Sequence, residues 1–334
     1  MSIPVSPSPG SETLLGTVPG AEALGLAETP FQQVWRTFRK DRLAMTGLVV
    51  LLSMILLAFF GKLLTEWWVV FDPATVRLPD KLLPPLSAPS SGLAKELLPP
   101  FHLYPFGTDE LGRNVFARML QGSFVSLSVG IVAVSISMAI GITVGGLAGF
   151  YGRQKLGFIS IDTLLMRFTD VVLCFPTFFL ILTVVALLPP SIYNIMIVIG
   201  ITSWMGTARF VRAEFLALRD QDFVTAAKAL GLPEWRIIFR HMVPNAMAPV
   251  LVSATIDVAY AILTESALSF LGFGVRPPFA TWGNILADGR SYIFDAPWLF
   301  IIPGSAILVV VLAFNLVGEG LRDAMNPKLR KRAS

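Results

Sequence analysis

The sequence predicts an all-α membrane protein with six transmembrane helices and a cytoplasmic loop built as helix–glycine–helix. Of its 334 residues, 54% are hydrophobic and only 14% are charged, whereas a soluble domain carries about 25% charged residues. Six apolar segments are each long enough to cross a bilayer, for which about 20 residues suffice. Lys and Arg residues are also distributed unevenly between the two sides of these segments.

The apolar segments divide the chain into spans and connections. We place the spans at residues 43–63, 126–150, 164–187, 192–211, 248–270 and 298–317. The first 30 residues have neither a basic start nor an apolar stretch, so they do not form a signal peptide. The predicted regions are a flexible cytoplasmic tail (1–35), a first transmembrane helix (36–63), an external proline-rich loop (64–125), a five-helix core (126–320) that contains the loop 214–245, and a basic cytoplasmic tail (321–334).

The basic residues orient the chain. Of the 26 Lys and Arg residues, 18 lie on the side that holds the termini and the loop 214–245. Because cytoplasmic loops carry an excess of Lys and Arg, both termini are predicted to be cytoplasmic, and residues 64–125 and 271–297 external. The basic residues border apolar spans, so we expect the bilayer and not a nucleic acid as their partner.

The cytoplasmic loop contains the clearest helical pattern outside the spans. Four apolar residues follow the i, i+3, i+4, i+7 spacing of one helix face, with small Ala226 and Ala227 expected on its exposed stripe. Asp220 or Asp222 can cap its start, and Gly231 can end it because glycine tolerates a positive φ. The four residues are Phe223, Ala226, Ala227 and Leu230.

A second short helix is predicted after Gly231. Pro233 suits its first turn, where a missing N–H is not needed, and Pro244 is expected to close it. From the pattern alone, the unit is either a hairpin lying on its own chain or the bilayer, or a docking element. Its apolar stripe is Trp235, Ile238, Phe239 and Met242.

Polar and small residues inside the spans suggest helix contacts. Gly141, Gly145 and Gly149 recur every four residues, a spacing that lets helices approach closely in lipid, against this chain or a partner subunit. Charges at membrane depth are costly and normally face a cavity or a partner. In the third span, which Pro176 interrupts, pairing of Asp170 with Arg167 is favoured over a cavity-lining role.

Two further acids lie in the fifth span. Asp257 and Glu265 are eight residues apart and can share one broad helix face, toward a translocation path or a subunit interface. Glu265 can instead be held by the loop that follows the span.

The cytoplasmic loop resembles a known signature. Ala226-Ala227, Gly231 and Pro244 match E-A-A–x3–G–x9–I–x–L–P of permease subunits of ATP-binding-cassette (ABC) importers, with Thr225 in place of Glu and His241 in place of Ile. In that family this loop docks into a cleft of the cytoplasmic ATPase. The resemblance implies a coupling role for Phe223, Thr225, Ala226, Ala227, Leu230, Gly231, Trp235 and Pro244.

A second resemblance is more specific. The segment GTDELGRN is similar to G-T-D-x-x-G-R-D of the dipeptide, oligopeptide and nickel permease group, with Asn114 replacing Asp. We expect Asp109 and Arg113 to cap and pair in a folded loop. The later blocks LSFLGFGVRPP, TWGNILADGR and LAFNLVGEGLRDAMNPKLR look like the C-type subunit of that group.

The resemblance also implies a function and partners. The expected function is import of di- or oligopeptides by alternating access in a bacterial or archaeal plasma (inner) membrane. The expected partners are a second permease in a heterodimer, two cytoplasmic ATP-binding subunits, and an extracellular or periplasmic solute-binding protein. An importer of nickel or another small solute is an alternative, as is a proton-coupled secondary transporter that uses Asp170, Asp257 and Glu265.

The sequence lacks the features of an enzyme. It contains no G-x-x-x-x-G-K-[ST] phosphate loop, so ATP and Mg²⁺ are expected on the partner ATPases and no cofactor on this chain. His102 and His241 are predicted on opposite sides of the membrane and cannot form one metal or catalytic site. The chain is therefore predicted to be a transport subunit without catalytic residues or a metal.

Overall fold

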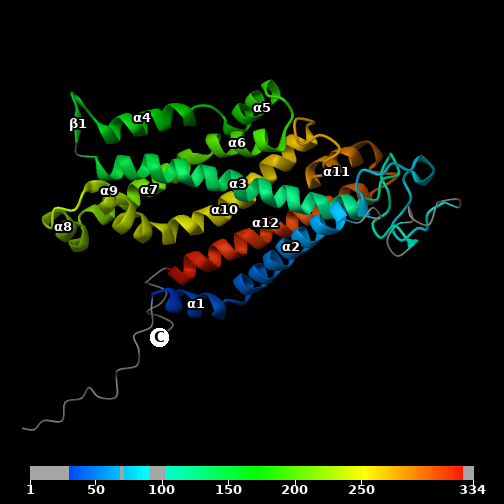
Figure 1. Cartoon of the computed structure of the whole chain (residues 1–334), viewed down its shortest axis with the longest axis horizontal. Helices are drawn as coiled ribbons and strands as arrows, with labels where there is room; N and C mark the ends of the chain where they lie inside the picture. Colours follow the sequence, from blue (N-terminus) through cyan, green and yellow to red (C-terminus); the bar gives the residue numbers. More distant parts are fainter. Residues whose placement is uncertain (1–29, 68–70, 91–98, 100–101, 153, 326–334) are drawn as a thin grey trace, which may run out of the picture.

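A computed structural model of the chain describes residues 30–67, 71–90, 99, 102–152 and 154–325. It is an elongated bundle of helices with residues 71–114 at one end and α8 and α9 at the other (Figure 1). The helices are α1 (Pro30–Lys40), α2 (Arg42–Trp67), α3 (Val115–Phe150), α4 (Ile161–Leu173), α5 (Thr177–Leu187), α6 (Ile192–Thr202), α7 (Trp204–Arg219), α8 (Asp222–Ala229), α9 (Glu234–Arg236), α10 (Val243–Phe270), α11 (Trp282–Gly289) and α12 (Trp298–Met325). Short elements are the 3₁₀ turns η2 (Leu78–Asp80) and η6 (Arg290–Tyr292), the π-helical segment η5 (Ile237–Met242), and an antiparallel pair of two-residue strands, β1 (Lys155–Leu156) and β2 (Ile159–Ser160).

The described helices include four that are long and apolar enough to cross a membrane. They are α2, α3, the continuous run Glu234–Phe270 and α12. Two further pairs of helices, α4–α5 and α6–α7, are long and apolar enough to cross a membrane only when each pair is counted as one span. The two helices of these pairs are bent by 77° and 41° at the break between them. The predicted mostly helical membrane fold is confirmed, with up to six spans if each bent pair counts as one.

Several predicted boundaries differ from the structure. Helix α1 begins at Pro30, inside the predicted tail 1–35, while residues 1–29 and 326–334 lie outside the described residues. The span predicted at 126–150 is part of a longer helix, α3, which begins at Val115 within the predicted loop 64–125. The Asn114 side chain accepts a hydrogen bond from the Phe116 N–H at 3.0 Å and so caps the N-terminus of this helix.

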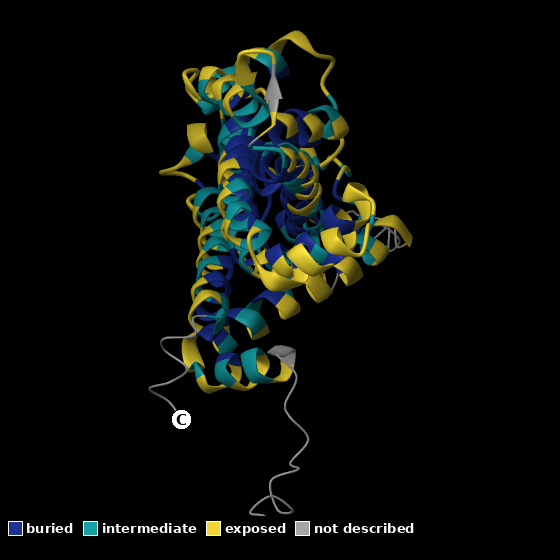
Figure 2. Ribbon diagram, turned by 90° about the vertical axis from the view of Figure 1, so that its left-hand side faces the viewer, coloured by how far each residue is buried: buried dark blue, intermediate teal, exposed yellow. Residues whose placement is uncertain are grey.

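Helix α3 is the centre of the bundle. It packs against α2, α6, α7 and α10. Figure 2 shows buried residues gathered in the interior of the bundle and exposed residues on its outside. A Cβ at Gly141 would lie 2.7 Å from Thr207 Cβ, and one at Gly149 would lie 2.5 Å from Phe215 Cβ. The glycine stripe, including Gly145 against Ala208, therefore lies in the α3–α7 contact of this chain.

A buried ionic network fixes the end of the bundle that carries residues 102–114 and α11. Asp109 is fully buried and its Oδ2 accepts hydrogen bonds from Arg113 Nε and Arg118 Nη1, each at 2.6 Å. Both arginines also reach Asp288 of α11, at 3.1 and 2.9 Å. Asp109 and Arg113 thus pair as predicted, and the network ties the segment before α3 to α11.

A second buried pair organises residues 71–114. The Tyr104 hydroxyl donates to Asp80 Oδ2 at 2.6 Å and accepts from Arg77 Nη1 at 3.1 Å. Burial and the hydrogen bond to Asp80 raise the pKa of Tyr104 to about 12. The phenol therefore stays neutral at physiological pH and serves as a donor inside this segment.

Candidate coupling surface and transport path

The glycine between α8 and α9 has the expected geometry. Gly231 has a φ of +71° and its N–H donates to the Lys228 carbonyl at 3.0 Å. The Leu232 N–H reaches back to the Ala227 carbonyl at 3.2 Å, which completes a left-handed C-cap. At the other end the prediction of an aspartate cap is wrong, because Gln221 is the N-cap residue and makes no side-chain capping bond.

The apolar stripe of α8 is divided between two environments. Val224 is fully buried and Ala227 is 5% exposed, whereas Ala226 is exposed and Leu230 is 80% exposed. The expectation that Ala227 lies on the exposed stripe is therefore wrong. The apolar spacing allowed either face to turn inward, and packing against α7 and η5 selects the side that carries Val224 and Ala227.

The second helix does not end at Pro244, which corrects the predicted boundary. The helix runs from Glu234 through η5 into α10 and continues to Phe270. Pro244 lies inside this continuous helix, just after the π-helical segment. Trp235 and Phe239 are each 61% exposed, while their predicted stripe partners Ile238 and Met242 are buried.

Polar and apolar contacts anchor the unit of α8, α9 and η5 to the bundle. The Tyr151 hydroxyl, just after α3, donates to Glu234 Oε2 at 2.8 Å. Lys228 Nζ lies 5.2 Å from the centroid of the Phe150 ring, a cation–π contact. Residues of α3, α7, α8 and η5 also share one hydrophobic cluster. The loop is therefore fixed to the ends of α3 and α7.

The acid of the third span pairs differently from the prediction. Asp170 Oδ1 lies 2.5 Å from Arg209 Nη2 of α7, and Arg167 is exposed. The prediction of an Asp170–Arg167 pair is wrong, since α7 packs beside α4 and presents a closer partner. A second bond of this kind joins Arg212 of α7 to Asp162 at the start of α4, with Nη2 and Oδ2 2.6 Å apart.

Glu265 lies in a fully buried polar cluster. Ser269 Oγ donates to its Oε1 at 2.6 Å, and Ser126 Oγ of α3 donates to its Oε2 at 3.3 Å. Ser126 Oγ also accepts from the Trp282 N–H at 3.3 Å, which connects the cluster to α11. This geometry is that of a structural carboxyl between α3, α10 and α11.

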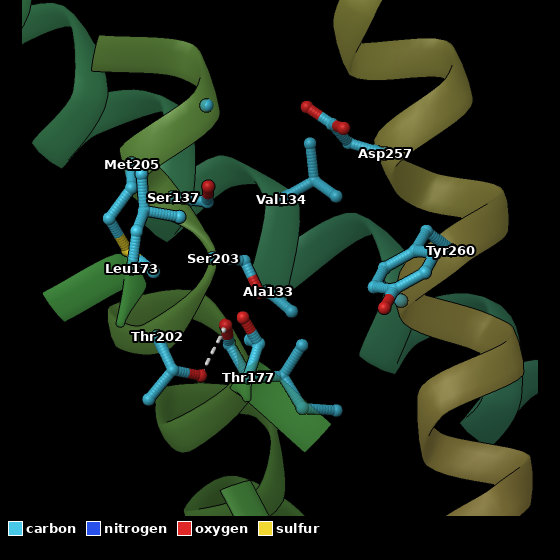
Figure 3. A pocket seen from close by; sticks show the side chains of 13 residues that line it. Ala133, Val134, Ser137, Leu173, Thr177, Thr202, Ser203, Met205, Asp257 and Tyr260 are labelled. Atoms are coloured by element: carbon cyan, nitrogen blue, oxygen red, sulfur yellow. Dashed lines mark hydrogen bonds between the residues drawn. The ribbon is translucent and has the colours of Figure 1, made fainter. Parts of the chain in front are cut away.

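Asp257 faces a different environment from Glu265. It lines a cavity of about 180 Å³ together with Tyr260 of the same helix, Ser137 of α3, Thr177 of α5 and Ser203 between α6 and α7. Figure 3 shows Asp257 and Tyr260 extending from one helix, with Thr177, Thr202 and Ser203 across from them. Thr177 and Ser203 were not predicted at this site, because they come from α5 and from the break between α6 and α7 and no spacing within one helix relates them to Asp257.

Comparison with known families identifies the chain. The family model described as "Binding-protein-dependent transport system inner membrane component" matches residues 141–331, and "N-terminal TM domain of oligopeptide transport permease C" matches residues 29–85. The chain belongs to the binding-protein-dependent permeases of the dipeptide and oligopeptide ABC importer group. Such a permease is a multi-pass inner-membrane transport component and not a catalytic enzyme.

Individual relatives of this permease cover most of its length. It is 38% identical to the dipeptide transport system permease protein DppC of Alkalihalophilus pseudofirmus, over 91% of this chain and 92% of that protein. It is 36% identical to the oligopeptide transport system permease protein OppC of Bacillus subtilis, over 88% of each chain. Its fold is similar to a chain in the inward-facing MetNI methionine ABC transporter, with a TM-score of 0.50 and 16% identity over 64% of this chain and 98% of that chain.

Proposed function

We propose that this permease is one membrane subunit of an ATP-driven importer of di- or oligopeptides. It works with a second permease, two cytoplasmic ATP-binding subunits that bind ATP and Mg²⁺, and a solute-binding protein outside the membrane. The matches to dipeptide and oligopeptide permeases over about nine tenths of the chain support this substrate class. The match to the oligopeptide permease C N-terminal domain supports the C-type position in a heterodimer.

The observation that carries the proposal is the exposed apolar side of α8 and α9. Leu230 is 80% exposed and Trp235 is 61% exposed, although the opposite side of the same unit is buried in the bundle. Aromatic and large aliphatic side chains in a contiguous exposed set are typical of a protein interface. The proposed contacts with the ATPase come from Phe223, Thr225, Ala226, Leu230 and Trp235. Gly231 shapes the turn, Ala227 supports it from inside, and Pro244 is exposed in the first turn of α10.

The proposed topology has six spans, with α4–α5 and α6–α7 each counted as one. Both termini and the α8–α9 unit are then cytoplasmic, in the plasma (inner) membrane of a bacterium or archaeon. This arrangement puts the unit next to the ATPases and residues 71–114 at the binding-protein side, because the two lie at opposite ends of the bundle (Figure 1).

The helix connectivity supports a mechanism of alternating access. Closure of the ATPase dimer moves the α8–α9 unit. Because one helix runs from Glu234 to Phe270, the movement reaches Asp257 at the middle of α10 without an intervening loop. We assign Asp257 to the translocation path. For Asp170 and Glu265 we propose structural roles, since each already has a bonded partner within the chain.

The test measures ATPase docking with substitutions on the exposed side. Ala226→Asp and Leu230→Asp each add a buried charge to the proposed interface. They should reduce co-purification of the ATPase subunits and solute-stimulated ATP hydrolysis at least about tenfold. Thr225→Glu is the matched control, because it adds the same charge at the position where the family signature has Glu. Ala227→Asp is unsuitable, since Ala227 is buried within this chain.

The docking of the ATPase subunits in the two aspartate variants decides between a coupling surface and a surface hairpin. Loss of docking in both aspartate variants, with normal yield of the two-permease membrane part, supports a coupling surface. Normal docking and stimulation in both variants would show that the unit is a surface hairpin and would overturn the assignment.

A further inference from the structure

Two broken helices meet at the cavity beside Asp257. Helix α4 ends at Leu173 and α5 begins at Thr177, and both residues line the cavity. Helix α6 ends at Thr202 and α7 follows after Ser203, and these two residues line the same cavity. Non-helical backbone at membrane depth is tolerated only where it is buried in protein or lines a water-filled cavity. The cavity at the two breaks, called the chamber below, is lined by polar side chains as well as apolar ones.

The chamber carries a negative charge. Asp257 is the only charged side chain among the described residues that line it, and no hydrogen bond or ion pair joins it to the part of the chain that the structure describes. The C-terminal ends of α4 and α6 meet the N-terminal ends of α5 and α7 at these breaks, so the opposite partial charges of the helix ends offset one another and the carboxyl of Asp257 supplies the charge. A carboxylate at this depth is costly unless it faces water or a positive partner.

The remaining lining groups are suited to a hydrogen-bond donor. Ser137, Ser203 and Tyr260 bring hydroxyl oxygens from three separate segments around Asp257. Thr202 donates its own hydroxyl hydrogen to the Val198 carbonyl at 2.6 Å, so its oxygen is left to accept a bond. A group with several N–H donors and one positive charge would satisfy both the carboxylate and these hydroxyls.

The size of the chamber limits what enters it. Pockets that enclose a whole small molecule usually measure about 300–1,000 Å³, and this cavity measures about 180 Å³. It can therefore hold one end of a solute. Within the described residues no group of three or more His, Cys, Asp or Glu side chains is placed to hold a metal ion, and the donor set does not favour a metal.

We propose that the chamber binds a primary ammonium group of the transported solute, with Asp257 as its counter-ion. The group is either the free N-terminus of a peptide or the end of a lysine side chain. The proposal rests on the proposed function, because it names the part of a peptide that this permease contacts.

The experiment distinguishes the contribution of the permease from that of the binding protein, because the complexes differ only at residue 257 of the permease. Reconstituted complexes carrying wild-type permease, Asp257→Asn or Asp257→Glu are given the same binding protein at saturation. Initial uptake is measured for a lysine-free tripeptide, its N-acetylated form, and an N-acetylated form containing one lysine. Each rate is divided by the amount of that peptide loaded on the isolated binding protein, and the yield of each complex is measured.

The expected result depends on the charge of the peptide. Asp257→Asn should slow the peptide with a free N-terminus at least about tenfold, because a charge-assisted bond is lost. It should leave the lysine-free acetylated peptide unchanged, and Asp257→Glu should retain most of the wild-type rate. If Asp257→Asn also slows uptake of the acetylated peptide that contains lysine, the site accepts any primary ammonium group. If the uptake rate of that peptide is unchanged, the site is specific for the peptide N-terminus.

Other results would overturn the proposal. Equal slowing of all three peptides would show that Asp257 acts in gating or assembly, and no slowing of any would show that it is dispensable. If Asp257→Asn does not assemble, Asp257→Ser is measured in its place. A wild-type complex that takes up no peptide in an ATP-dependent way would instead overturn the proposed function, and this inference with it.

Discussion

At the scale of single residues, Gly231 controls the shape of the proposed coupling surface. Its φ of +71° is a conformation that costs a residue with a side chain roughly 1–2 kcal/mol. A Cβ there would meet no other atom within 4 Å, so backbone strain is the whole effect.

We predict that Gly231→Val keeps the permease in the membrane but lowers solute-stimulated ATP hydrolysis. The physical reason is that the turn between α8 and α9 opens while the spans are untouched. Hydrolysis and ATPase co-purification are measured against Gly304→Ala, since a Cβ at Gly304 would make only an ordinary contact, 3.6 Å from Leu286 Cδ1. Hydrolysis at the wild-type level in Gly231→Val would show that the turn geometry is unimportant for docking.

A second residue-scale prediction concerns Asp109. Asp109→Asn keeps the size of the side chain but leaves Arg113 and Arg118 with less negative charge in a buried site. Breaking a buried ion pair by removing one partner costs about 3–5 kcal/mol. We expect a lower melting temperature and less complex. Glu66→Gln is the control, because the Lys62–Glu66 pair is solvent-exposed and 3.7 Å long; similar melting temperatures for both variants would contradict the role of the network.

At the scale of elements, the contact between α3 and α7 determines where the coupling unit is held. Gly145 faces the Ala208 backbone, and a Cβ at this position would also lie 2.9 Å from Val211 Cβ. The two helices must separate to admit a side chain, and they carry the anchors of α8 and η5 at their ends.

We predict that Gly145→Val destabilises the permease by about 1–3 kcal/mol, the usual cost of overpacking, and also impairs ATPase docking. Thermal unfolding of the purified complex and ATPase co-purification are the measurements. Gly304→Ala is again the matched control, because it adds a Cβ inside a spanning helix without a close contact. A Gly145→Val variant with wild-type stability would mean that the α3–α7 contact is looser than the structure has it.

At the scale of the whole molecule, the proposed orientation can be tested with two cysteines. Cys174 is exposed and is first replaced by serine. Leu78→Cys, at a site 65% exposed, and Leu230→Cys, at a site 80% exposed, then report the two ends of the bundle. An impermeant thiol reagent added to intact cells should label only Leu78→Cys, and both should react after the membrane is opened. Labelling of both in intact cells would contradict the six-span topology.

Much of the fold was predictable because its signals are local. Apolar length defined the spanning helices, and the need for a positive φ placed Gly231 at a turn. The spacing of Gly141, Gly145 and Gly149 indicated a close helix contact. Each of these signals depends on a few consecutive residues, so the sequence was sufficient for them, as it was for the family resemblance through Ala226, Gly231 and Pro244.

The tertiary structure decided what depends on residues far apart in the chain. Ala226 and Ala227 carry the same side chain, and only the packing of α8 on α7 and η5 buries one and exposes the other. Asp170 pairs with a residue 39 positions away, and Asp109 reaches α11 through its arginines. The chamber at Asp257 exists because two helix breaks meet there. The arrangement of the helices determines which neighbour a side chain contacts, and this information is not present in the spacing of residues within one helix.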